Sequence, residues 1–262
     1  RYEEATRICR DAAHIFALSL GYDHPWHAAA LHRLASLLLV QNHRDEAASF
    51  FNKAISIHEN HFNARLRWDN KTSATTTTVS TSSQSKNNQC FENTLTEASP
   101  NTGPIQRQKE TPEMAATLLA FGDMLRLEDE TVGEAVQLLE RSLRIFQSVY
   151  GEGHEKCALA HNNLGLAYQK MSYIASLDQS RQHLTTSLQI YRNLLGEGHP
   201  QVAMIENNLA GTLWKQGDIS AARQAMLRAQ AVLVAKYPRH HPTNRGIEWA
   251  LRALNNDEPC PL

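Results

Sequence analysis

The chain has 262 residues, of which 42% are apolar, so it can bury a sizeable core in one elongated domain or two compact ones. Lysine and arginine number 26 against 27 aspartate and glutamate residues, and this balance argues against recognition of nucleic acid or anionic membranes through overall charge. No apolar run approaches the roughly 18 residues that a membrane span needs. The four cysteines lack CxxC spacing, which favours free thiols in a reducing, cytoplasmic compartment.

The first predicted elements are helices. Residues 1–20 carry apolar side chains at helical spacing, and the patterns of 25–41 and 43–62 predict a helical hairpin. The chain begins in the middle of such a pattern, so we expect it to be part of a longer protein. Residues 1–62 are therefore predicted to hold half a repeat followed by one full repeat.

A polar insert follows. Residues 63–110 are rich in serine, threonine and asparagine, and no apolar period survives in them. Such a segment cannot bury enough surface to offset the entropy of ordering it, so we predict that it is disordered. The sequence leaves open whether this insert is a loop on one continuous stack of helices or divides the stack in two.

Helical patterning returns over residues 111–255, and 256–262 form a polar tail. We expect three hairpins and then a single helix that covers the end of the stack. These predicted elements are, in order, 112–150, 154–195, 199–237 and 241–255.

The turns between these units repeat one motif, which reads "YGEGHE" at 150–155 and "LGEGHP" at 195–200. The residue after the histidine starts the elements at Glu155, Pro200 and Pro242, and Pro112, which follows Thr111, takes the same place in its unit. These four positions are 43, 45 and 42 residues apart. Copies of one turn in a stack of helix pairs lie roughly 20 Å apart, whereas ligands of one metal lie about 2 Å from it. The recurring histidines are therefore predicted to cap or pack against the next helix, and we expect no metal and no cofactor. These histidines are His24, His154, His199 and His241.

The second helix of each unit carries a small, a large and a small residue on one face, which lets two helices approach closely. The sets are Ala5/Cys9/Ala12, Ala47/Phe51/Ala54, Ala135/Leu139/Ser142, Ser180/Leu184/Ser187 and Ala222/Met226/Ala229. Together with "HNNLGLAYQK" (161–170) and "ENNLAGTLWKQG" (206–217), this pattern resembles the tetratricopeptide repeat. The long period and the "LGEGHP" turns are similar to those of kinesin light chains and nephrocystin-3-like proteins. The resemblance implies an all-α fold, a right-handed α-solenoid of helix hairpins interrupted by the insert.

A candidate peptide-binding surface lies on the first helices, which line the concave side of such a solenoid. Asparagine can hold a peptide backbone, lysine and arginine favour acidic partners, and tryptophan can stack on an apolar anchor. The candidates are Arg126, Asn162, Asn163, Gln169, Lys170, Asn207, Asn208, Trp214 and Lys215. The resemblance implies peptide contact for Asn163 and Asn208 above all. The hairpins at 25–62 and 112–150 lack the asparagine pair, which confines the expected site to the C-terminal half.

Each of these side chains also has an ordinary structural interpretation. The asparagines can bond the neighbouring helix, Trp214 can belong to the core, and Lys170 and Lys215 can be solvated residues at helix ends. The sequence alone leaves these alternatives open.

The chain carries no motif of an enzyme, neither a nucleophile elbow nor a P-loop nor a zinc-protease helix. We therefore expect a non-catalytic adaptor that binds peptide segments of other proteins, of the cargo-adaptor, ciliary or cytoskeletal type. The alternative is a structural scaffold that self-associates and takes no peptide.

Overall fold

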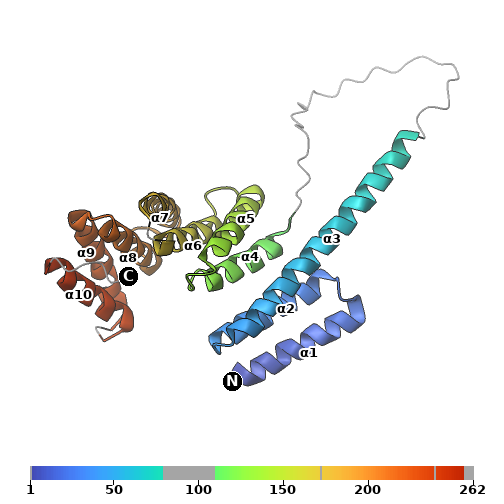
Figure 1. Ribbon diagram of the computed structural model, residues 1–262, viewed down its shortest axis with the longest axis horizontal. Helices are drawn as coiled ribbons and strands as arrows, with labels where there is room; N and C mark the ends of the chain where they lie inside the picture. Colours follow the sequence, from blue (N-terminus) through green and yellow to red (C-terminus); the bar gives the residue numbers. More distant parts are fainter. Residues whose placement is uncertain (1, 79–109, 172, 239, 257–262) are drawn as a thin grey trace, which may run out of the picture.

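The computed structural model describes residues 2–78, 110–171, 173–238 and 240–256, and the described residues form helices and their connections (Figure 1). Figure 1 shows the helices following one another along the long axis of the molecule, as a solenoid requires. The helices are α1 (Tyr2–Leu20), α2 (Pro25–Val40), α3 (Arg44–Thr78), α4 (Pro112–Leu125), α5 (Val132–Tyr150), α6 (Glu155–Met171), α7 (Ile174–Leu195), α8 (Pro200–Lys215), α9 (Ile219–Lys236) and α10 (Pro242–Asn255).

The recurring histidines cap helices, as predicted. His24, His154 and His199 each accept a hydrogen bond through Nδ1 from the backbone N–H two residues further on, at 3.2, 3.1 and 3.1 Å. His241 does the same for α10 at 3.4 Å. The bond satisfies one of the N–H groups that have no partner in the first helical turn. The motif is thus one turn built four times.

Glycine ends the preceding helix in three of these turns, because the chain must reverse with a positive φ. Gly151 and Gly196 have φ values of 84° and 82°, in the region that side chains disfavour. In both turns the glycine N–H still bonds the helix, at 3.0 Å for Gly151 and 2.9 Å for Gly196. The "GEGH" sequence therefore encodes a helix stop and the next helix start within five residues.

Within each complete hairpin the two helices are in close contact through the small–large–small sets. All twelve residues of the sets on α3, α5, α7 and α9 are at most 2% exposed. A Cβ on Gly165 would lie 2.5 Å from Leu184 Cγ, so the α6 backbone rests directly on that side chain. The hydroxyl of Ser180 donates to the Gly165 carbonyl at 2.7 Å, which satisfies a buried polar group at the crossing.

The end of α3 differs from the prediction. The helix was expected to stop at residue 62 and the disordered insert to begin at 63, but α3 continues to Thr78. Residues 63–78 contain no glycine or proline to end it. The described side chains just past Phe62 (Asn63, Ala64, Arg65 and Arg67) are exposed, so this part of α3 projects from the stack. Residues 79–109, on which the rest of the predicted insert falls, lie outside the described residues.

The helices before and after the insert form one continuous stack. Phe51 of α3 and Phe121 of α4 stack with ring centroids 5.6 Å apart and share a core with Leu34 and Leu38. Arg141 of α5 bridges the same junction, because it pairs with Glu59 of α3 at 2.8 Å and with Glu110 before α4 at 2.7 Å. Of the two arrangements that the sequence left open, the structure adopts the continuous one.

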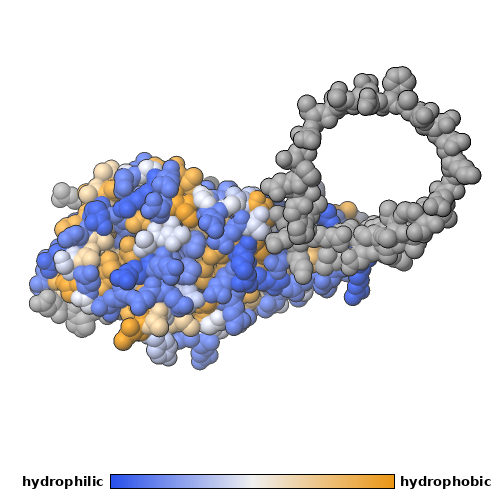
Figure 2. Space-filling model, turned by 90° about the horizontal axis from the view of Figure 1, so that it is seen from above, coloured by the Kyte–Doolittle hydropathy of each residue, from blue (hydrophilic) through white to orange (hydrophobic). Residues whose placement is uncertain are grey.

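Successive first helices lie on the inner side of the curve, since α2 contacts α4, α4 contacts α6 and α6 contacts α8. Apolar and polar residues are interspersed on the face that Figure 2 shows. None of the described helices is both long and apolar enough to cross a membrane. The first helices are thus the surface on which a site has to be sought.

Candidate functional site

The asparagines of the predicted site bond one another across the seam between α6 and α8. Asn208 donates from Nδ2 to Oδ1 of Asn162 at 2.9 Å, and Asn162 donates to Oδ1 of Asn163 at 3.1 Å. Asn163 is only 6% exposed, whereas Asn162, Asn207 and Asn208 are half-buried. The structure therefore favours the interpretation in which these amides join neighbouring first helices.

Gln169 belongs to the same seam. Its Nε2 donates to the Thr212 hydroxyl at 3.0 Å and to the Asn208 carbonyl at 3.3 Å, and the residue is 9% exposed. A buried amide that is already hydrogen-bonded gains little from a ligand. The prediction that Asn163 and Gln169 face an open groove is therefore wrong, because the close approach of α6 and α8 buries both.

The predicted cations also have partners within the stack. Lys170 donates to the Leu127 carbonyl at 2.8 Å and pairs with Asp129 at 3.0 Å, and Lys215 donates to the Gln169 carbonyl at 3.1 Å. Each lysine thus stabilises the C-terminal end of the first helix one repeat earlier, where carbonyls have no intrahelical partner. Arg126 pairs with Asp123 on its own helix at 2.7 Å.

Trp214 is a core residue. It is 3% exposed and packs with Ala210 of α8, Met226 of α9 and Leu254 of α10. The prediction of an exposed aromatic anchor is wrong here, because α10 covers the face of α8 that would otherwise be open. Figure 1 shows α10 beside α9 at the end of the stack.

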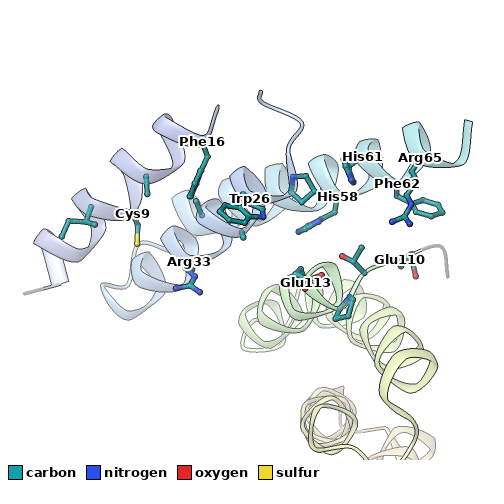
Figure 3. Close-up of a pocket in the computed structure, with 17 residues that line it drawn as sticks. Cys9, Phe16, Trp26, Arg33, His58, His61, Phe62, Arg65, Glu110 and Glu113 are labelled. Carbon is teal, nitrogen blue, oxygen red and sulfur yellow. The ribbon is translucent and has the colours of Figure 1, made fainter. Parts of the chain in front are cut away.

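A large opening lies in the N-terminal half instead, between α1, α2, α3 and the start of α4 (Figure 3). It encloses about 880 Å³, in the range of pockets that bind ligands. Trp26 stands in it 62% exposed, with its ring edge-on to Phe16 at 5.7 Å. We call it the α1–α4 groove; its lining includes Ile8, Cys9, Ala12, Phe16, Trp26, Arg33, His58, His61, Phe62, Arg65, Glu110 and Glu113.

The unpaired charge in this groove is mainly positive. Within the described residues no carboxylate lies within 4.0 Å of the guanidinium of Arg33 or of Arg65. Glu110 is neutralised by Arg141, which leaves Glu113 as the remaining acidic side chain of the lining. An acidic partner is therefore favoured at both ends of the groove.

His58 is a buried polar group without a partner in the groove lining. It is 5% exposed, and its Nε2 has no hydrogen-bond partner among the described residues. Burial lowers the pKa of His58, which keeps the imidazole neutral at neutral pH. A buried nitrogen of this kind is costly to leave unbonded, so a ligand that reaches it gains a hydrogen bond.

The α1–α4 groove could not be predicted from the asparagines of the first helices, because α2 contains none. Arg33 lies on the concave face of α2, but the absence of an asparagine pair from this hairpin confined the expected site to the C-terminal half. The available signal was the Ala5/Cys9/Ala12 set, which has no first helix before it to cover it within the described residues.

A second cluster of buried titratable groups lies between α6 and α7. Nδ1 of His161 and Nδ1 of His183 are 2.8 Å apart, and Tyr168 stacks on His183 at 5.6 Å while donating to Glu140 at 3.0 Å. Burial and the neighbouring His183 lower the pKa of His161 to about 4, and burial lowers that of His183. Among the described residues no group of three or more His, Cys, Asp or Glu is placed to hold a metal ion.

This pair makes the stability of the protein pH-dependent. The unfolded chain binds the histidine protons below about pH 6.5, but folded His161 resists protonation until about pH 4. The contribution of His161 to the free energy of unfolding is therefore constant above that range and falls as the pH drops from 6.5 towards 4. We expect His161→Gln to reduce this slope in urea titrations between pH 7 and 5. His32 and His58 have lowered pKa values too, so part of the slope remains. An identical slope in the variant would contradict the assignment.

Helix hairpins stacked into a right-handed solenoid define a class of repeat proteins that bind other proteins. A profile of the tetratricopeptide repeat matches residues 1–60, 113–172 and 175–233. The chain belongs to the tetratricopeptide repeat family. No curated protein matches it in sequence.

Solved structures share this fold, and two of them match over most of their length. The crystal structure of BtubC (BKLC) from P. vanneervenii superposes with a TM-score of 0.65 at 14% identity, over 98% of this chain and 84% of that one. A kinesin light chain candidate from Podosopora anserina with nearly identical TPR-like repeats superposes with a TM-score of 0.59 at 16% identity, over 89% of this chain and 87% of that one. The stack of long helix pairs is thus common to kinesin-light-chain-like repeat proteins.

Proposed function

We propose that this protein is a non-catalytic adaptor that binds segments of partner proteins in the α1–α4 groove. The observation that carries the proposal is the groove itself, an opening of about 880 Å³ with the exposed Trp26 standing in it. Tetratricopeptide repeats are in general interaction modules. An aromatic side chain beside a pocket supplies a large contact area at low entropic cost, which suits a partner anchor.

The proposed partner segments are acidic. Arg33 and Arg65 lack carboxylate partners among the described residues and can pair with aspartate or glutamate of a bound segment. The preference for acidic partners remains a proposal, and we assign it to Arg33 and Arg65 instead of Arg126, Lys170 and Lys215. Asn207 and the half-buried faces of Asn162 and Asn208 can extend contact towards the C-terminal half.

The setting that we propose is cytoplasmic, with a role as a cargo adaptor or in ciliary or cytoskeletal assemblies. The similarity in fold to a kinesin light chain candidate supports this setting. The cysteine pattern agrees with it, since Cys9 and Cys157 are free thiols.

Peptide display tests the proposal. We expect an unconstrained peptide library panned on the full chain to yield acidic binders, and Arg33→Glu with Arg65→Glu to weaken them about tenfold or more. Trp26→Ala is expected to weaken them to a similar extent, since it removes the apolar anchor. Fluorescence anisotropy measures the change in Kd. Arg144→Glu on α5 is the matched control, because Arg144 is exposed and lies outside the groove lining. If no peptide from the library binds in a way that depends on Arg33, Arg65 or Trp26, the proposed function is contradicted.

Self-association is the alternative, and exposed apolar side chains at the two ends of the stack favour it. Ile15 and Leu18 of α1 are 61% and 67% exposed, and Trp249 of α10 is 51% exposed. A mass that rises with concentration in light scattering, together with an empty groove, would support the scaffold over the adaptor.

A further inference from the structure

His58 lies at the end of the α1–α4 groove that α2, α3 and α4 form. It is 5% exposed, it lines the groove, and its Nε2 has no hydrogen-bond partner among the described residues. Figure 3 shows His58 between Arg33 of α2 and Arg65 of α3, close to the start of α4. These side chains are carried by α2 and α3, so this end of the groove is formed without α1.

The free groove keeps the imidazole of His58 neutral. Burial lowers the pKa of His58 and has the largest effect, the carboxylate of Glu113 raises it, and the imidazoles of His32 and His61 lower it. A single exposed carboxylate therefore opposes the burial of the charged form. The ionisable groups around His58 are His32 and Arg33 on α2, His61 and Arg65 on α3, Glu113 on α4, the Cys9 thiol on α1, and Glu110, which precedes α4 and pairs with Arg141.

An acidic segment in the groove reverses this balance. Among the described residues no carboxylate lies within 4.0 Å of the guanidinium of Arg33 or Arg65, so these cations attract carboxylates of a ligand to either side of His58. A carboxylate close to Nε2 accepts a charge-assisted hydrogen bond from the protonated imidazole, which is stronger than the bond that the neutral ring donates. The bound ligand also displaces water, which strengthens the attraction between the two charges. The complex therefore holds a proton that the free protein does not.

We propose that binding of an acidic partner segment in the α1–α4 groove is coupled to the uptake of one proton by His58. The groove then holds its partner more tightly at mildly acidic pH than at neutral pH. This inference rests on the proposed function, and it adds how binding at that site is regulated.

The direction of the pH dependence follows from the two states of His58. Burial lowers its pKa in the free protein, and the ligand carboxylate is expected to raise it in the complex, so the complex takes up its proton first as the pH falls. Affinity therefore rises as the pH falls below neutrality, and it levels off once His58 of the free protein is protonated as well. The ligand carboxylates stay ionised throughout, since aspartate and glutamate titrate near roughly pH 4.

Acidic peptides recovered from the display library at about pH 7.5 provide the probes. We expect the Kd of the full chain, measured by fluorescence anisotropy at constant ionic strength, to fall about tenfold between about pH 7.5 and about pH 5.5. His58→Gln is expected to bind within about threefold of the wild type at the higher pH and to lose most of the pH dependence. Glutamine keeps a polar N–H at this position but does not titrate.

His61→Gln is the matched control, because His61 is on the same helix and in the same lining but is exposed. Water already solvates an exposed imidazole, so this change is expected to leave most of the pH dependence in place. Isothermal titration calorimetry in two buffers of different ionisation enthalpy counts the protons taken up on binding. Near pH 6.5 we expect about half a proton or more per bound peptide, both for the wild type and for His61→Gln. This count does not require a His58 variant to fold.

The outcomes separate this inference from the proposed function. Peptides that depend on Arg33 and Arg65 but take up no proton and bind equally well at both pH values would overturn the coupling and leave the adaptor in place. Loss of the pH dependence in His61→Gln together with its retention in His58→Gln would overturn the assignment to His58. Absence of any binder that depends on Arg33, Arg65 or Trp26 would contradict the proposed function and this inference with it.

Discussion

Replacing Trp214 with alanine is expected to lower the free energy of unfolding by about 3–5 kcal/mol. Trp214 is 3% exposed and joins α8, α9 and α10 in one core cluster. Removing its ring leaves a cavity that three helices have to close at once, and within the described residues α10 packs mainly against α9. Urea denaturation followed by circular dichroism measures the loss, and hydrogen exchange is expected to show α10 opening first.

Trp249→Ala is the matched control for this change. Trp249 lies on α10 but is 51% exposed, so its removal is expected to alter stability by less than about 1 kcal/mol. The pair also decides between the two roles that the sequence allowed for Trp214. Loss of peptide binding by Trp214→Ala at unchanged stability would restore it as a ligand anchor and contradict its assignment to the core.

The repeat made most of the fold predictable from the sequence. A Gly-x-x-His turn before three of the four complete helix pairs fixes where one helix stops and the next begins, and His154 and His199 cap as expected. The small–large–small sets predicted which faces would be fully buried, and Leu139 and Leu184 are 0% exposed. These features are local or periodic, so they can be identified without knowledge of distant contacts.

The candidate site was less predictable, because exposure depends on how repeats pack. A groove-facing position in an isolated helix is open, but the approach of α6 to α8 turns Asn163 and Gln169 into a hydrogen-bonded seam. The lysines at the ends of the first helices also bond within the stack, since Lys215 donates to a carbonyl of the preceding repeat. Periodicity gives the side of the helix on which a residue lies, but not how near the next helix will be.

The end of α3 shows a different limit. Residues 63–78 have little apolar content, which argued for disorder, yet they contain no residue that stops a helix already in progress. Extending a helix costs less than starting one, so α3 continues beyond the last packed turn. Its exposed continuation brings Arg65 to the α1–α4 groove, so a feature that composition could not predict contributes to the candidate site.

Replacing Gly165 with alanine is expected to destabilise the protein by about 1–3 kcal/mol, although alanine favours helices more than glycine does. The added Cβ would lie 2.5 Å from Leu184 Cγ and 3.3 Å from the Ser180 carbonyl, so α6 and α7 have to separate. Separation also strains the 2.7 Å bond from the Ser180 hydroxyl to the Gly165 carbonyl, which has no access to water. Thermal and urea unfolding measure the effect.

Gly246→Ala on α10 is the control for the backbone contribution, because nothing lies within 4 Å of the Cβ that it adds. It is expected to be neutral or to stabilise by up to about 1 kcal/mol. A double-mutant cycle isolates the contact. Leu184→Ala alone is expected to cost about 2–5 kcal/mol, but combined with Gly165→Ala the total is expected to be smaller than the sum, because the new methyl fills part of the space that leucine vacates. Strict additivity would show that the two helices do not meet at this crossing.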